Sequence, residues 1–351
     1  MNTQCKLLNA GSVFAALLTA MVMTGCTPTP QQQFAARMQT QYGIDKREVE
    51  AGLQQAEKKD DIIALMTKPA EAVKPWKDYA PIFLTDARRN NGVAFWREHA
   101  DTLAKAEQQF GVPAEYIVAI IGVETNYGRI MGKHRVLDAL NTLAFYYPPR
   151  SPYFTGELEQ FFVLAREQNW DLTTPMGSYA GAMGMGQFMP TSYRKWAVDF
   201  DGDGQVNLFQ TPADAIGSVG NYFRIHGWQT GGAMMLPVSF AAEPAGSLLY
   251  PKRDVAPLND LFAAGMQAPV ALQPDWQAAL LVFDEADGRH YYLGFNNFRV
   301  ITRYNKSPLY ARAVLEFAGQ LKAAYLQPST ATATSATTPP ANSSRAGVGS
   351  R

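Results

Sequence analysis

Apolar residues recur at helical spacing over most of the chain. Residues 34–66 have the pattern of short amphipathic helices, for which Asp45 and Asp60 are candidate N-caps. A longer helix is predicted near 93–110, and the next begins at Pro113 and ends by Gly128. Further helices are predicted over 155–168, over 211–227, where Thr211 and Asp214 have capping-box spacing, and from Ser307 to about residue 326. The chain is therefore expected to be mainly α-helical.

The pattern changes between residues 233 and 303. Short runs of β-branched, aromatic and aliphatic residues at 279–283, 291–295 and 298–302 predict strands, separated by Gly, Asn, Asp and Pro. No internal repeat is present. The expected fold class is α+β, mainly α, with a small antiparallel β subdomain before the final helix.

The first 25 residues read as a secretory signal, with Lys6 followed by an apolar run and then small residues. The sequence that ends at Cys26 resembles a bacterial lipoprotein processing site, although an ordinary signal peptide with an incidental cysteine is the alternative. Cys5 lies inside the signal, so the mature chain is expected to form no disulfide. The polar segment 26–33 would then tether the protein to a membrane without spanning it.

Composition limits the partners. Basic and acidic residues balance at 31 each, which gives no indication of a nucleic-acid partner. After the signal, no stretch reaches the roughly 20 apolar residues of a spanning helix. Residues 327–351 consist mainly of Pro, Ser, Thr, Ala and Gly, and are expected to be disordered.

Glu124 is the strongest candidate for catalysis. Residues 117, 120, 121 and 124 follow helical spacing, so this carboxylate shares a face with three isoleucines. Burial raises the pKa of a carboxyl group, as a general acid at neutral pH requires. The alternative is that Glu124, in the last turn, simply reaches solvent.

Three separate motifs carry a family resemblance. The runs 121–128 (IGVETNYG), 181–190 (GAMGMGQFMP) and 297–305 (NFRVITRYN) resemble, in this order, signatures of the membrane-bound lytic murein transglycosylase B family. The likeness extends over residues 34–326. It implies a lysozyme-like core at 111–232, a helical domain at 34–110, a β subdomain at 233–303 and a C-terminal helix at 304–326.

The resemblance also implies a reaction. Family members cleave the β-1,4 bond between N-acetylmuramic acid and N-acetylglucosamine and form 1,6-anhydromuramoyl ends. Glu124 matches the family's sole acid and base, which acts with the substrate's N-acetyl group and without a second carboxylate. The alternatives are a hydrolysing muramidase, which a second acid across the cleft would favour, and a peptidoglycan-binding lipoprotein without turnover.

Other site residues follow from matching family positions. Ser178 is implied as a hydroxyl near Glu124 or the N-acetyl group, and Gln187, Tyr79, Tyr222 and Asn297 as cleft residues that contact sugars. Each of these could instead be structural. The family commonly has adjacent arginines after a Tyr-Pro pair, whereas here only Arg150 matches, which puts the contacts to the peptide stem in doubt.

A metal site is predicted at residues 199–206. Positions 1, 3 and 5 of an EF-hand calcium loop are occupied by Asp199, Asp201 and Asp203. Gly202 lies between the last two acids, Gly204 follows them at position 6, and Gln205 is at position 7. Gln210 stands at position 12 in place of the usual Glu. The resemblance implies that a later acid, Asp214, closes the site, although Asp214 also fits a helix cap. Calcium would be structural, and no organic cofactor is expected.

The remaining motifs exclude other chemistries. Histidines 99, 134, 226 and 290 lack metal-ligand spacing, so a zinc hydrolase is not indicated. The glycine-rich run 177–186 fits neither a nucleophile elbow nor a dinucleotide fingerprint. An Asp after the lipidated cysteine commonly retains such lipoproteins at the inner membrane, but here Thr27 follows Cys26. The resemblance therefore implies an anchor at the periplasmic face of the outer membrane.

Overall fold

A computed structural model describes residues 27–68 and 74–327, and 54% of it is helical. The predicted signal peptide, Cys26 and the tail beyond residue 327 lie outside the described residues. The chain divides at Glu50 into two compact units. The first contains α1 (Pro30–Tyr42), which opens with a reciprocal capping box between Thr29 and Gln32. The tether was predicted to extend to residue 33, but the helix already begins at Pro30, so this boundary is wrong.

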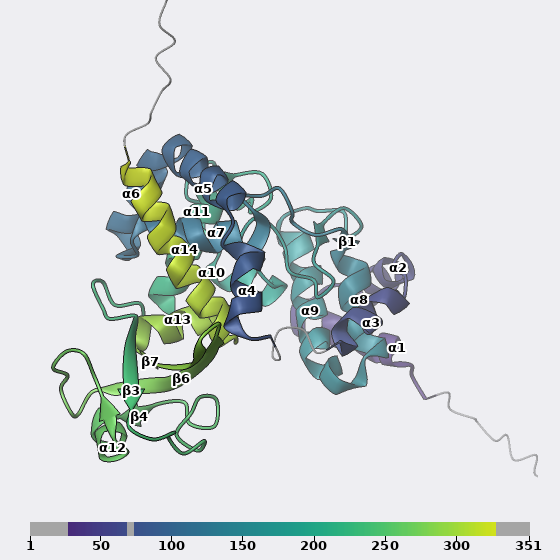
Figure 1. Cartoon of the computed structure of the whole chain (residues 1–351). Helices are drawn as coiled ribbons and strands as arrows, with labels where there is room; N and C mark the ends of the chain where they lie inside the picture. Colours follow the sequence, from purple (N-terminus) through teal and green to yellow (C-terminus); the bar gives the residue numbers. More distant parts are fainter. Residues whose placement is uncertain (1–26, 69–73, 328–351) are drawn as a thin grey trace, which may run out of the picture. The chain divides into compact units, whose positions relative to one another are not determined.

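The second unit carries most of the helices (Figure 1). Helix α2 (Lys46–Gln54) spans the division between the units, and the amide of Arg47 bonds to Asp45, its predicted cap. Asp60, by contrast, is the first residue of its helix and not its cap. The helices that follow are α3 (Asp60–Thr67), α4 (Trp76–Phe83), α5 (Asp86–Glu98), α6 (Ala100–Phe110), α7 (Ala114–Thr125), α8 (Val136–Tyr146), α9 (Ser151–Glu167), α10 (Pro190–Trp196), α11 (Pro212–Ile225), α12 (Leu258–Ala263), α13 (Asn296–Tyr304) and α14 (Pro308–Leu326).

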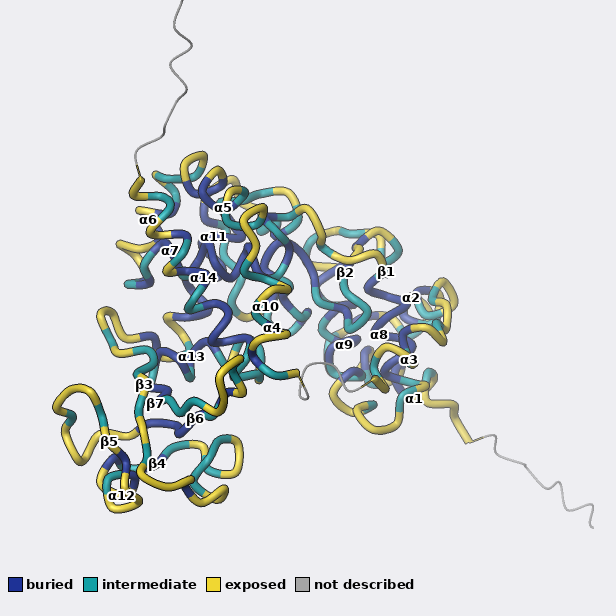
Figure 2. Tube along the Cα trace, viewed as in Figure 1, coloured by how far each residue is buried: buried dark blue, intermediate teal, exposed yellow. Residues whose placement is uncertain are grey.

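Helix α7 is the centre of this unit. It packs against α5, α6, α11 and α14, and only Tyr116 and Glu124 among its residues are not buried. Buried stretches of the unit lie at α7, α11 and α14, and also at α8 and α9 (Figure 2). A helix that is apolar on every side has to be enclosed by others, and α7 is. Gly122 has no side chain to hold the neighbours away, so Phe317 of α14 and Tyr127 pack directly on its backbone.

Two helix boundaries differ from prediction. The single helix predicted over 93–110 is two helices that meet at His99, whose backbone leaves the helical region at φ −112°. Pro113 is the N-cap of α7 and not its first helical residue. The helix ends at Thr125, before Gly128, because Asn126 and Tyr127 both adopt left-handed backbone conformations.

A five-stranded antiparallel sheet forms the β subdomain, in the order β4-β6-β7-β3-β5. Its strands are β3 (Met235–Phe240), β4 (Ala256–Pro257), β5 (Met266–Gln267), β6 (Gln277–Glu285) and β7 (Gly288–Gly294). Leu258, Leu261, Leu280 and Leu293 are in the core on which the sheet packs. The strand predicted at 279–283 is confirmed in full, and the strand predicted at 291–295 is confirmed over 291–294.

The predicted strand at 298–302 is wrong, because these residues form part of α13. Phe298 and Ile301 lie one helical turn apart and are both buried, so a helix gives them a common apolar face. The β-branched pair Val300 and Ile301 favours a strand by propensity alone, and tertiary packing overrides it here.

A second, two-stranded sheet pairs β1 (His134–Arg135) with β2 (Met176–Gly177). It joins the turn after α7 to the glycine-rich run. Within residues 27–68 and 74–327, no helix is long and apolar enough to cross a membrane.

Alanine at Gly122 should destabilise the fold. A Cβ there would lie 2.4 Å from the Tyr127 hydroxyl oxygen and 2.8 Å from Phe317 Cε1. Overpacking of this kind costs about 1–3 kcal/mol of unfolding free energy, which denaturant titration would measure. The matched control is Gly319→Ala on α14, where a Cβ meets nothing within 4 Å. That variant should be neutral or stabilised by up to about 1 kcal/mol, and equal losses in both would contradict the account.

Candidate active site

Glu124 is the penultimate residue of α7 and is half-buried. Ile117, Ile120 and Ile121, which precede it on the same face, are fully buried. The carboxyl group therefore lies where the apolar core meets the surface. This position matches the placement that the sequence predicted for it, without complete burial.

Tyr310 fixes the Glu124 carboxylate. Its hydroxyl donates a hydrogen bond of 2.6 Å to Glu124 Oε1. Burial raises the pKa of Tyr310 well above its ordinary value, and the charge of Glu124 raises it further. The hydroxyl therefore stays protonated and acts as a donor. The bond orients the carboxylate, and the sequence analysis did not identify this tyrosine.

Tyr304 belongs to the same environment. Burial first, and then the Glu124 charge, raise the pKa of this tyrosine well above its ordinary value. Its hydroxyl donates to the carbonyl of Gly186 at 2.6 Å. Tyr79 of α4, which was predicted as a cleft residue, is 1% exposed, and such burial favours the structural alternative for it. Tyrosines from α13 and α14 are thus bound to Glu124 and to the glycine-rich run near the end of α7.

The glycine-rich run is bound to the end of α7 through Thr125. The Thr125 hydroxyl donates to the Met185 carbonyl at 2.8 Å and accepts the Gly128 amide at 3.0 Å. Gly184 has φ +69°, and a Cβ there would lie 2.6 Å from the Leu208 carbonyl oxygen. Only glycine fits at this point, which explains the close approach of the loop.

Ser178 and Gln187 bracket this loop. Ser178 Oγ accepts the amides of Ala180 and Ala182 at 3.3 and 3.0 Å, so its own proton is still available for donation. Gln187 Nε2 donates to the carbonyls of Met131 and Gly184, each at 3.1 Å. Both side chains are half-buried. They brace the loop in this structure and have surface left for a ligand.

A cavity of about 640 Å³ lies at the start of α14, and neither Tyr310 nor Glu124 is among the residues that line it. It is bordered by Ser307, Pro308 and Leu309, which immediately precede that tyrosine, and by Tyr179, which follows Ser178. Aromatic and apolar side chains dominate its walls, as they do in sugar-binding clefts. The other lining residues are Lys74, Pro75, Trp76, Tyr250, Pro251, Val282, Phe283, Asp284, Asn305 and Lys306. The β subdomain therefore supplies one wall.

Trp76 is held in this wall by Arg312. The guanidinium lies 4.2 Å from the Trp76 ring centroid and 4.7 Å from that of Phe283. It also forms ion pairs of 2.8 Å with Glu285 and Glu316. The cation thus ties α4, β6 and α14 together at the cavity.

Asn297 was predicted as a cleft residue, and the structure contradicts this. The side chain is fully buried, accepts the Gln229 amide at 2.8 Å and donates to the Gln229 carbonyl at 2.7 Å. It fixes the loop before β3 and presents no surface to a sugar. The residue of this motif that does line the cavity is Asn305.

Tyr222 and Arg150 also have structural contacts. The Tyr222 ring stacks on His226 at 3.9 Å and its hydroxyl donates to the Arg303 carbonyl at 2.7 Å, which leaves it 7% exposed. Such burial favours the structural alternative for Tyr222. Arg150 is exposed, and its guanidinium lies over the rings of Tyr153 and Phe154 at 4.7 and 4.9 Å.

The predicted metal loop brings three carboxylates together. One oxygen from each of Asp199, Asp201 and Asp203 lies within 4.8 Å of the others, and all three residues are exposed. Asp199 accepts the amides of Gly202 and Gly204 at 2.7 and 2.8 Å, and these bonds lower its pKa. Three carboxylate oxygens that lie this close together are an arrangement that suits a hard cation.

Asp214 organises this loop from beneath. It is 1% exposed, and its two oxygens accept the amides of Phe200 and Asn207 at 2.8 and 2.7 Å. Burial raises its pKa, and the charges of Asp201 and Asp199 add to that effect. Thr211 makes no side-chain cap bond, so the predicted capping box of α11 is absent. Asp214 closes the loop by bonding both of its ends.

Sequence patterns gave no signal for the most important contact. Tyr310 lies three residues into α14, where Ser307 caps the helix, and an apolar helix face predicts a core tyrosine there. The sequence analysis also missed four residues of the cavity wall for the same reason: Trp76, Tyr179, Tyr250 and Asn305. Each borders the cavity only because elements distant in sequence pack together.

Comparisons with known proteins are consistent over most of the chain. Residues 28–319 match the model of the transglycosylase SLT domain. The chain is 44% identical over 305 residues to Membrane-bound lytic murein transglycosylase B of Escherichia coli (strain K12), covering 84% of this chain and 83% of that protein.

Solved structures agree with this match. The lytic transglycosylase Slt35 of Escherichia coli, solved in complex with calcium, has a TM-score of 0.77 at 44% identity, covering 85% of this chain and 94% of that one. SltB3 of Pseudomonas aeruginosa, solved with NAG-anhNAM-pentapeptide, has a TM-score of 0.71 at 30% identity, covering 83% and 79%.

Proposed function

Because the chain belongs to the transglycosylase SLT domain family and is a lytic murein transglycosylase, we propose that Glu124 is the acid that cleaves the glycan strand of peptidoglycan. The observation that carries the proposal is the hydrogen bond from Tyr310 to Glu124 Oε1, which fixes this carboxyl group at the end of the central helix α7. A half-buried carboxyl group held by a neutral donor has a fixed orientation and stays close to substrate.

The proposed reaction uses this one carboxyl group twice. Glu124 first gives its proton to the glycosidic oxygen, and the N-acetyl oxygen of the muramic acid stabilises the positive charge at C1. The resulting carboxylate then takes the proton of the C6 hydroxyl, whose oxygen bonds to C1. No water is consumed, and Glu124 ends protonated, ready for the next cycle.

The substrate is proposed to be a glycan strand that carries peptide stems. The relative SltB3 was solved with NAG-anhNAM-pentapeptide, a ligand of this class. In this chain Trp76, Tyr179 and Tyr250 line the cavity, and aromatic side chains are common in ligand-binding pockets. Ser178 and Gln187 are proposed to bond the N-acetyl and hydroxyl groups, and Arg150 to contact the stem.

Hydrolysis is the second candidate, because Asp284 also lines the cavity. A second carboxylate could activate water from the opposite side of the sugar. Asp284, however, is 62% exposed in its side chain and lies 3.3 Å from Arg289. An exposed carboxylate already engaged in an ion pair is not positioned to activate a water, so transglycosylation is favoured over hydrolysis.

Calcium is proposed to bind the 199–205 loop through Asp199, Asp201, Asp203 and the backbone carbonyl of Gln205. The clustered carboxylates support this, as does the calcium complex of Slt35. Asp214, whose oxygens both accept backbone amides, would hold the loop ends in place and add negative charge beneath the ion. The role of the ion would be structural.

A lipid anchor at Cys26 is proposed to hold the enzyme at the periplasmic face of the outer membrane. The named relative is membrane-bound, and no described helix of this chain could span a bilayer. Acyl chains on Cys26 would supply attachment in another way, since two or more chains suffice for stable anchoring.

Glu124→Gln should lower turnover of purified peptidoglycan at least about a hundredfold, because the amide cannot donate the proton and general acid catalysis contributes ~10²–10⁴-fold. The matched variant is Asp284→Asn, which should retain turnover within about twofold. Release of muropeptides, followed by chromatography, measures both. A Glu124→Gln enzyme with more than about a tenth of normal turnover, or an inactive Asp284→Asn enzyme, would contradict the single-acid mechanism.

Calcium should raise the melting temperature of the full chain relative to chelator, because binding to the folded state adds about 2.7 kcal/mol at a hundred times Kd. Asp201→Ala should abolish the increase. The control is Asp287→Ala, which removes the exposed acid of the other cluster, Glu285, Asp287 and His290. Calorimetry that finds no calcium effect in the unmutated chain would refute the metal site.

Cys26→Ser should remove membrane partition and palmitate labelling in cells, because the thiol that accepts the lipid is gone. Turnover by the purified catalytic portion should be unchanged. Fractionation that finds the unmutated protein wholly in the soluble periplasm, without label, would show that residues 1–25 end in an ordinary signal peptide.

A further inference from the structure

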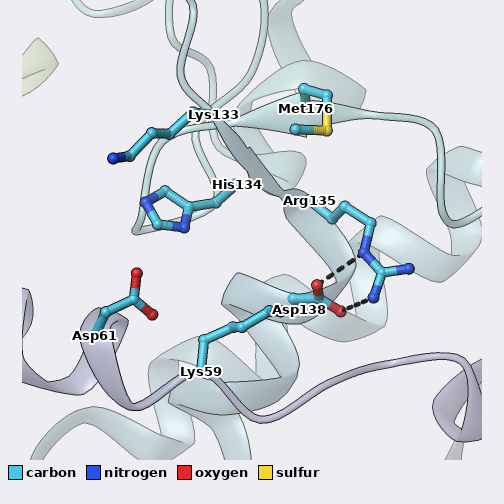
Figure 3. Close-up of a pocket in the computed structure, with 7 residues that line it drawn as sticks. All are labelled: Lys59, Asp61, Lys133, His134, Arg135, Asp138 and Met176. Atoms are coloured by element: carbon cyan, nitrogen blue, oxygen red, sulfur yellow. Dashed lines mark hydrogen bonds and ion pairs between the residues drawn. The ribbon is translucent and has the colours of Figure 1, made fainter.

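A second pocket, of about 320 Å³, shares no lining residue with the cavity described above. Charged side chains from three segments surround it (Figure 3). Its lining residues are Lys59, Asp61, Lys133, His134, Arg135, Asp138 and Met176.

Part of this charge is already neutralised within the wall. Arg135 bonds both oxygens of Asp138 at 2.8 and 2.9 Å, and Asp138 is 2% exposed. Lys59 Nζ lies 2.5 Å from Glu57 Oε2. The segment before α3 is held against α8 by two further bonds, from the Glu57 amide to Asp138 Oδ1 at 2.9 Å and from the Lys59 amide to Thr142 Oγ1 at 3.0 Å.

Three other charged or titratable groups point into the open space. Lys133 and His134 come from one wall and Asp61 from the opposite wall (Figure 3). Within residues 27–68 and 74–327, none of these three side chains makes a hydrogen bond or an ion pair. The pocket therefore presents two basic groups and one acidic group that a ligand could engage.

The backbone links the pocket to the active-site loops. His134 pairs with Gly177, the residue before Ser178, in the β1–β2 ladder. Gln187 Nε2 donates to the carbonyl of Met131, two residues before Lys133. A peptide that leaves a sugar bound near Ser178 could thus follow this strand pair into the pocket.

We propose that this pocket binds the zwitterionic end of the diamino acid in a peptidoglycan stem peptide. Lys133 and His134 would take its carboxylate, Asp61 its free ammonium group, and Met176 would contact the methylene chain. The proposal rests on the proposed function, since the peptide arrives attached to the glycan that Glu124 cleaves.

The mixture of charges selects this ligand class. Three cationic side chains and two carboxylates line the pocket, which leaves a formal charge of only +1 with neutral His134. A polyanion would be repelled by Asp61, and an uncharged sugar would leave Lys133, His134 and Asp61 without a charged partner. A zwitterion on a short alkyl chain matches both signs at once. Cross-linking consumes the ammonium, so uncross-linked stems should bind better.

Binding is tested without turnover, in the full chain carrying Glu124→Gln. The probe is the tetrapeptide L-Ala-γ-D-Glu-meso-diaminopimelyl-D-Ala, titrated by calorimetry. Adding Lys133→Ala or Asp61→Asn should weaken binding about tenfold, as loss of a charge-assisted hydrogen bond does. Lys68→Ala, an exposed lysine at the end of the same helix as Asp61, should leave Kd unchanged. Acetylation of the diamino acid's free amine should weaken binding similarly.

Turnover by the enzyme with Glu124 intact gives a second, separate readout. Lys133→Ala should raise KM for strands that carry tetrapeptide stems by about tenfold without changing kcat, and should leave strands stripped of their stems unaffected. Absence of saturable tetrapeptide binding, equal Kd values in Lys133→Ala and the parent, or equal KM changes for both substrates would overturn the proposal. Because binding is measured with Glu124 replaced, failure of the catalytic proposal would not produce the two binding outcomes.

Discussion

The hydrogen bond between Tyr310 and Glu124 is the contact on which the active site depends. It joins α14 to the end of α7, across 186 residues of sequence. The two helices approach closely because Gly122 lets Phe317 pack on the backbone of α7. The packing that stabilises the core thereby also sets the orientation of the carboxyl group, because the single hydroxyl proton of neutral Tyr310 is donated to it.

The loops around Glu124 depend on the same helix end. Thr125 ties the glycine-rich run to α7 through the Met185 carbonyl, and Tyr304 holds the run from the other side through Gly186. The β subdomain completes the cavity, with Arg312 binding the Trp76 ring against Phe283. Fixed donors on rigid elements of this kind favour a reaction that needs one well-placed acid.

Local sequence pattern predicted what is local in the structure. The helix that carries Glu124 and the gathering of Asp199, Asp201 and Asp203 follow from spacing within a few residues. The contact from Tyr310 could not be predicted this way, because it depends on how α14 packs. Asn297 was misassigned for the converse reason: its motif resembled a cleft segment, while its side chain turned inward to bind the loop at Gln229.

The most direct test of the account is the chemistry of the cleaved ends. Peptidoglycan digested by the purified full chain should be reduced with borohydride and analysed by mass spectrometry. Transglycosylation through Glu124 alone predicts 1,6-anhydromuramoyl ends, which have lost one water and resist reduction. Muramic acid ends that carry the added water and accept hydride would show hydrolysis, and would contradict the proposal that one carboxyl group acts without a water nucleophile.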